Sequence, residues 1–191
     1  MHVCGPRALV AYEIFSDELR AVFSPDRHEI EIVWMPAALH TNITLLEGEL
    51  ERTLSCLKSR GFDDLQVMYG ACSPSIDAIL EKHCAARPVQ RNCMDIFLGP
   101  ESAAVEAEGA IAFTPGWIRA WPSIMTAMGW EDVDVRMNLG RYTSALVYDA
   151  GIKPLTDDET LWFFDVSGLY VDIRPRDLKH LKETLIDLLK M

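Results

Sequence analysis

The sequence lacks the features that would place the protein in a membrane or on nucleic acid. No apolar run approaches the roughly 18–20 residues needed to span a bilayer. The N-terminal apolar stretch contains a glutamate and has no small-residue cleavage site, so we interpret it as part of the fold rather than as a signal peptide. Lysine and arginine do not cluster, and the formal net charge is −11. We therefore expect no nucleic-acid partner and no membrane partner.

Two other absences concern small ligands and cysteine chemistry. The segment YGACSPS has a single glycine, so it is not a phosphate-binding loop, and nucleotides are not expected as ligands. The five cysteines are odd in number and irregularly spaced, which does not fit a disulfide framework. Without a signal peptide or a disulfide framework, we expect a cytoplasmic protein, since thiols stay reduced in the cytosol. We expect its substrate to be a small molecule.

The order of the apolar patterns predicts an α/β fold. The 191 residues are enough for one sizeable core, and we expect a single domain over residues 1–191. β-rich runs alternate with amphipathic segments, which favours a mostly parallel sheet with helices on both faces, a three-layer Rossmann-like arrangement. Strands are predicted near residues 7–14, 29–36, 65–70, 88–91, 109–114, 144–151 and 169–175. Helices are predicted near residues 15–24, 43–61, 73–86, 92–99, 115–130 and 176–190, with a loop at 99–109.

In open parallel sheets, ligands bind outside the carboxyl ends of the strands, so residues at strand ends are candidates for a site. The first expected strand ends near Tyr12 and Glu13, and the second is followed by His40. The third and fourth are followed by Cys72 and Cys93. The later strands bring three more candidates: Thr114, Trp117 and Asp149.

One imidazole and two thiolates make a ligand set suited to zinc, with a fourth position left open for water or substrate. We therefore predict a Zn²⁺ site made of His40, Cys72 and Cys93. Helix N-termini expected beside both cysteines would lower their pKa and favour the thiolate. Gly70 would let the backbone come close to a bound group.

The other candidate side chains have ordinary explanations. Cys56 lies within an amphipathic helix and is expected to pack, while Cys84 and its neighbour His83 point about 100° apart on a helix and would chelate poorly. Cys4 precedes the first strand and is a minor candidate. Trp117 is expected to wall an apolar pocket at its strand end. The aromatic stretch around Trp162 could form an interface in a homo-oligomer.

The motifs MPAALH, VMYGAC, RNCMDIFLG and FTPGW, in this order, resemble the DUF1638 family of α/β proteins over nearly the whole chain. The resemblance implies metal ligation by His40, Cys72 and Cys93. Family members typically carry a cysteine at the end of the first strand, where this chain has Tyr12, which could donate a proton or cover the pocket. Many carry an aspartate where this chain has Asn92. Genes of the family often lie near those of corrinoid proteins and methyltransferases, which implies one-carbon chemistry and a possible corrinoid-protein partner by association.

Three functions are compatible with these residues. The first is a zinc-dependent enzyme that transfers a methyl or other group to a thiol, or hydrolyses its substrate with water at the metal. In it, Tyr12 and Asp149 are catalytic candidates, Thr114 and Trp117 contact substrate, and Asp95 or Asp149 could orient the histidine ligand. The second is a non-catalytic accessory protein that carries a metal or cofactor. The third makes Cys72 a nucleophile with His40 as its base.

Overall fold

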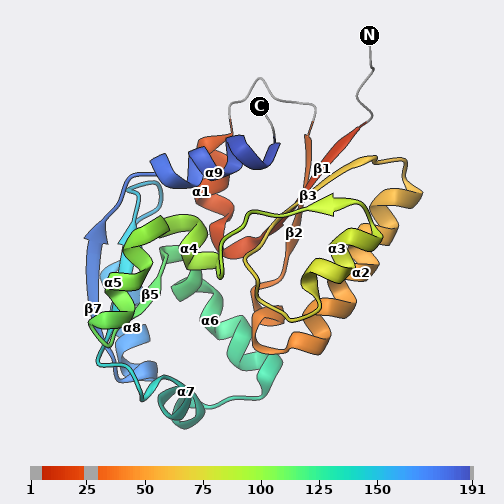
Figure 1. The fold of residues 1–191 in the computed structure, drawn as a ribbon. Helices are drawn as coiled ribbons and strands as arrows, with labels where there is room; N and C mark the ends of the chain where they lie inside the picture. The colour runs from red at the N-terminus through yellow and green to blue at the C-terminus, as the bar shows by residue number, and fades with distance from the viewer. Residues whose placement is uncertain (1–5, 24–29, 190–191) are drawn as a thin grey trace.

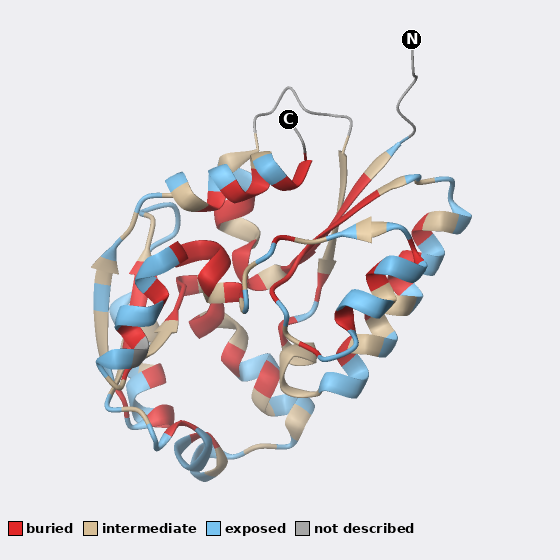
Figure 2. Ribbon diagram, viewed as in Figure 1, coloured by how far each residue is buried: buried red, intermediate tan, exposed pale blue. Residues whose placement is uncertain are grey.

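The computed structural model describes residues 6–23 and 30–189 (Figure 1). Its strands form two parallel sheets, and helices pack on both faces, as the α/β prediction requires. No helix in the described ranges is both long and apolar enough to cross a membrane. Figure 2 shows the buried residues concentrated along the first sheet and between the two sheets.

The first sheet holds four strands in the spatial order β2–β1–β3–β4, all parallel. These strands are β1 (Arg7–Tyr12), β2 (Ile30–Met35), β3 (Asp64–Met68) and β4 (Ala85–Ala86). β1 is central and almost wholly buried. Tyr12 at its end is paired in register with Met35 of β2. The carboxyl ends of the four strands therefore lie along one edge of this sheet.

The second sheet holds three parallel strands in the order β5–β6–β7. They are β5 (Ile111–Phe113), β6 (Ser144–Asp149) and β7 (Tyr170–Pro175). The prediction of a parallel sheet is thus confirmed, but the strands divide between two sheets instead of forming one. β4 is only two residues long and is soon followed by Pro88, which has no N–H, so it offers few backbone groups for a further strand.

Helices surround and connect the sheets (Figure 1). The α-helices are α1 (Ser16–Val22), α2 (Ile43–Ser59), α3 (Ile76–Lys82), α4 (Cys93–Leu98), α5 (Ser102–Ala107), α6 (Pro115–Met128), α7 (Asp132–Leu139), α8 (Asp157–Ser167) and α9 (Lys179–Leu189). The 3-10 helices are η1 (Glu13–Phe15), η2 (Ala37–Thr41) and η3 (Gly99–Glu101). Helices α2 and α3 lie on one side of the first sheet, and α1 and α9 lie on the other. α6 packs against η1 and η2 as well as against β5 and β6, so it joins the two sheets.

The sequence pattern of helix α2 explains its buried face and its two ends. Leucines recur at helical spacing along one face, and all four are buried against the first sheet: Leu46, Leu50, Leu54 and Leu57. The Asn42 side chain caps the helix by accepting a hydrogen bond from the Leu45 N–H at 3.1 Å. Gly61, with φ of +88°, lies just beyond its end. The predicted bounds are therefore correct to within two residues.

Several local predictions were wrong. The expected loop at 99–109 contains η3 and α5, because its alanine-rich segment has high helix propensity. Helix α3 begins at Ile76, three residues after the predicted start of the 73–86 helix. The fourth strand occurs at Ala85–Ala86, just before the predicted 88–91 segment. Helices α7 and α8 were not predicted.

Candidate metal centre

The three predicted metal ligands meet at the carboxyl edge of the first sheet. One donor atom each from His40, Cys72 and Cys93 lies within 4.8 Å of the others. The two sulfurs are 3.4 Å apart. His40 lies in η2 after β2, Cys72 lies in the turn after β3, and Cys93 is the first residue of α4 after β4. The three side chains that the strand-end argument grouped therefore lie together.

The position of His40 is fixed by the end of β1. The Tyr12 hydroxyl donates to the Ala37 carbonyl at 2.5 Å, and the Ala37 N–H donates to the Glu13 carboxylate at 2.5 Å. Both bonds hold the start of η2, which carries the histidine. The Tyr12 ring also stacks on the imidazole, with ring centroids 5.5 Å apart and planes at 22°. The edge of the Trp117 ring system contacts the imidazole from another direction, at 5.2 Å between centroids.

The two cysteine segments are held against each other through their backbones. The Ala71 N–H donates to the Gln90 carbonyl at 3.2 Å. A Cβ built on Gly70 would fall within 2.7 Å of the Asn92 backbone nitrogen, so only glycine permits this approach. The close approach predicted for Gly70 therefore exists, and its partner is the backbone that precedes Cys93.

The pKa values of the two thiols are shifted in opposite directions. A hydrogen bond from Cys93 lowers the pKa of Cys72, and backbone groups of Gly70 and Cys93 assist. The partner thiolate and burial raise the pKa of Cys93 well above its ordinary value. The acidity of Cys72 thus comes from its neighbour; a helix N-terminus does not supply it, since α3 begins four residues later. Burial lowers the pKa of His40, so the imidazole is neutral near pH 7 and able to bind a metal.

The distance between the sulfurs, the unpaired histidine nitrogen and the charge of the thiolates fit a metal ion. The Nδ1 atom of His40 is buried without a hydrogen-bond partner among the described residues, which leaves a donor atom unused. Two sulfurs bound to tetrahedral zinc at about 2.3 Å are roughly 3.8 Å apart, close to the 3.4 Å seen here. Two thiolates would balance the charge of Zn²⁺, which suits the buried position of Cys93.

Among the other predicted site residues, Tyr12 and Trp117 lie at the cluster. Tyr12 is wholly buried, and burial, with the nearby sulfurs, raises its phenol pKa far above the ordinary value. Its hydroxyl is already donated to Ala37, so the structure assigns it to positioning the histidine segment. Trp117 walls a cavity beside the cluster, as predicted. Thr114 is wholly buried and caps α6: its hydroxyl accepts from the Trp117 N–H at 3.3 Å and donates to the Ile14 carbonyl at 3.2 Å.

The two aspartates do not contact His40. Asp149 ends β6 in the second sheet, accepts a hydrogen bond from the Gly151 N–H, and lines a different cavity. Asp95 accepts from the Ser102 hydroxyl at 2.5 Å and from Arg91 at 3.1 Å. Neither therefore orients the imidazole in this structure. The expectation was wrong for Asp149 because β6 belongs to the second sheet.

The remaining cysteines take no part in the cluster. Cys56 and Cys84 are exposed, and all four cysteines in the described ranges are free thiols. Cys84 has φ of +51° and follows α3 directly after His83. Cys4 lies outside the described residues.

Residues 34–185 match the family described as "Protein of unknown function (DUF1638)". The chain belongs to the DUF1638 family. The matched range covers most of the chain and includes all three residues of the cluster, whereas Tyr12 lies before it. No curated protein matches the chain.

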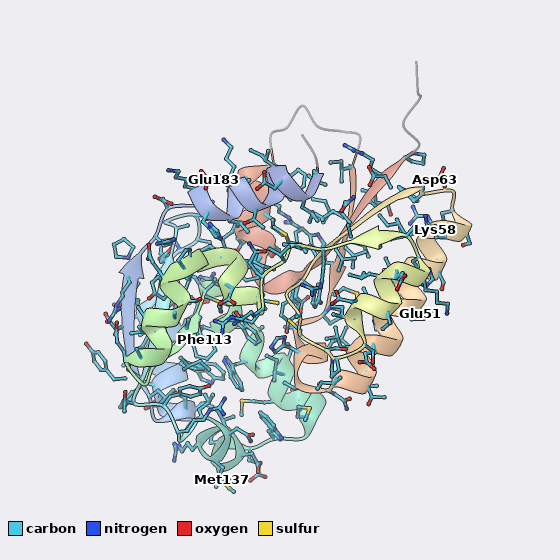
Figure 3. The ribbon with its side chains drawn as sticks, in the orientation of Figure 1. Glu51, Lys58, Asp63, Phe113, Met137 and Glu183 are labelled. Atoms are coloured by element: carbon cyan, nitrogen blue, oxygen red, sulfur yellow. The ribbon has the colours of Figure 1, made fainter. Side chains whose placement is uncertain are left out.

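The wider surroundings of the cluster were not predicted from the sequence. A cavity of about 670 Å³ begins at His40 and Cys93 and extends along residues of β5, α6 and α7. Figure 3 labels Phe113, which lines this cavity in the interior, whereas the labelled Glu51, Lys58 and Met137 lie at the periphery. The aromatic residues after Thr114 were the available signal, but α7 and the residues after it had not been predicted.

Proposed function

We propose that this DUF1638 protein is a zinc-dependent enzyme that transfers a methyl or other small group to a thiol substrate. The observation that carries the proposal is the convergence of His40, Cys72 and Cys93, with sulfurs 3.4 Å apart, at the edge of a large cavity. The cluster holds three donors, and three protein ligands with one open position are typical of catalytic zinc.

The three side chains would hold the ion, and bound there it would act as a Lewis acid that lets a substrate thiol ionise at neutral pH. Tyr12 and Glu13 keep the histidine segment in place through their bonds to Ala37. The Trp117 ring packs edge-on against the imidazole, with centroids 5.2 Å apart, and supports its orientation. The neutral imidazole remains available for ligation because burial lowers its pKa.

The compartment and partners belong to the same proposal. The free thiols of the described cysteines support a reducing, cytoplasmic setting. A corrinoid protein as methyl donor rests only on the family resemblance. A homo-oligomer is supported by the exposure of Leu161 and Phe164 on α8, beside Trp162. The acidic net charge supports the absence of a nucleic-acid partner.

A second candidate is a non-catalytic accessory protein that carries the metal. The observation in its favour is that Cys93 is only 2% exposed, since structural zinc sites are closed. X-ray absorption at the zinc edge separates the two candidates. Two sulfurs, one nitrogen and an exchangeable light-atom ligand support the enzyme, while a fourth protein ligand supports the accessory role.

Metal analysis of protein purified without a histidine tag tests the proposal itself. We expect about one zinc per chain, and its loss in Cys72→Ser, Cys93→Ser and His40→Ala. Cys56→Ser is the matched control, because Cys56 is an exposed free thiol on α2 outside the cluster. Thiol titration should find two cysteines that are protected with zinc and reactive after chelation. Equal metal content in Cys93→Ser and Cys56→Ser would contradict the zinc site.

A further inference from the structure

The cavity beside the cluster has the size and the lining of a small-molecule site. Its volume of about 670 Å³ lies within the usual range of roughly 300–1,000 Å³ for ligand pockets. Aromatic side chains from several elements line it: Phe113, Trp117, Trp121, Trp130 and Tyr142. Such a lining favours an apolar, flat ligand body.

The charge of the lining differs from that of the whole molecule. The chain has 29 aspartates and glutamates, yet none of the residues found lining this cavity is acidic. Arg141 is the one lining side chain with a permanent positive charge among the described residues. In a protein of net charge −11, such a cavity repels an anionic ligand less than an acidic surface would, and it offers the ligand one cationic partner.

The guanidinium of Arg141 is held at the cavity wall and remains available. It lies over the Tyr142 ring, 4.8 Å from the centroid, and its Nη2 donates to the Tyr142 hydroxyl at 2.6 Å. No carboxylate within the described ranges forms an ion pair with it. Most of its five N–H donors are therefore free to bind a carboxylate through two parallel hydrogen bonds.

Arg141 and Cys93, which both line the cavity, come from different parts of the fold. Arg141 follows α7, whereas Cys93 begins α4, and these helices lie well apart in Figure 1. A ligand that contacts both would run along the aromatic walls between them. Its acidic group and its reacting group would then be at different ends.

We propose that the cavity selects small organic carboxylates with an apolar, preferably aromatic body. The carboxylate binds Arg141, the body lies between the tryptophans of α6, and the other end reaches His40 and Cys93. This assignment rests on the proposed function for the identity of the reacting end. The carboxylate preference itself depends only on Arg141 and the cavity lining.

Isothermal titration calorimetry at pH 7.5 with 3-phenylpropanoate and its neutral amide tests the proposal. We expect the acid to bind wild-type protein roughly ten-fold more tightly than the amide, since a hydrogen-bonded charge contributes about that much. Arg141→Gln should remove the preference and leave amide binding within about two-fold. Arg52→Gln is the matched control, because Arg52 is an exposed arginine on α2, paired with Glu49, whose loss changes the net charge equally. Circular dichroism of both variants checks that they fold.

Measurements with and without zinc separate this proposal from the proposed function. A carboxylate preference that persists in metal-free protein supports the cavity assignment even if the chain proves to hold no zinc. Four results would overturn it. The first three are equal binding of acid and amide, a preference that survives Arg141→Gln, and acid binding that disappears with the metal. The last would place the carboxylate on zinc. Failure of either probe to bind would also overturn it, since the aromatic walls should accept the amide.

Discussion

Replacing Gly70 by alanine should separate the two cysteine segments and weaken metal binding. The added Cβ would fall within 2.7 Å of the Asn92 backbone nitrogen, whereas ordinary contacts begin at 3.4 Å. Backbone atoms cannot rotate away as a side chain can, so the Asn92 segment must shift by up to about 1 Å. Cys93 follows directly and would move with it.

The consequence for the metal is larger than the consequence for folding. Ligand distances in a metal site are held to about 0.2 Å, so a shift of the expected size moves one sulfur out of range. Loss of supporting contacts alone usually lowers metal affinity about 10- to 100-fold. For Gly70→Ala we expect the zinc affinity to fall by about 100-fold or more. Overpacking costs roughly 1–3 kcal/mol of folding stability, so the variant should still fold.

Gly48→Ala provides the matched control. Gly48 lies in α2, and an added Cβ there meets nothing within 4 Å. The same chemical change should stabilise the protein by up to about 1 kcal/mol, because alanine favours the helix. Zinc affinity is measured by competition with a chromophoric chelator, and stability by urea unfolding of the metal-free proteins. If Gly70→Ala binds zinc within about two-fold of Gly48→Ala, the backbone contact does not set the sulfur positions.

Four further substitutions test other parts of the structure. Burial raises the pKa of Glu18 to about 7, so its contribution to stability is complete below about pH 4.5 and is lost as pH rises to 7. Glu18→Gln should remove up to about 3 kcal/mol of this pH dependence, measured by urea unfolding from pH 4 to 8. Tyr12→Phe removes the hydrogen bond to Ala37 and should cost about 1–2 kcal/mol, whereas Tyr69→Phe removes a buried hydroxyl that has no partner in the described structure and should be neutral or stabilising. Thr114→Val should cost about 1 kcal/mol in thermal unfolding, through loss of the α6 cap.

Each of these has an opposite outcome that can be observed. A Glu18→Gln variant whose stability falls with pH as steeply as wild type means that Glu18 is not the titrating group. Equal losses in Tyr12→Phe and Tyr69→Phe would show that the bond to the histidine segment does not contribute. A Thr114→Val variant as stable as wild type would mean that the start of α6 is held by packing alone.

Part of the site could be predicted because it follows from local rules. Apolar runs alternating with amphipathic helices require parallel strands, and parallel strands place their carboxyl ends at one edge. His40, Cys72 and Cys93 follow three strands of one sheet, so this rule was enough to group them. Asp149 obeys the same rule in the second sheet, and the sequence contained no sign that the strands would divide.

The sequence by itself determined the order of the main strands along the chain, the buried face of helices such as α2, and which three side chains follow the strands of the first sheet. These depend on periodicity and residue chemistry over short stretches. Tertiary structure alone decided that the sulfurs lie 3.4 Å apart, that α6 packs against the η2 segment carrying His40, and that Arg141 faces the same cavity as His40. These facts depend on close approaches between distant segments. One such approach passes between Gly70 and Asn92, and another between Gly116 and the Ile14 carbonyl. Contacts of this kind arise only when the packed elements are present together.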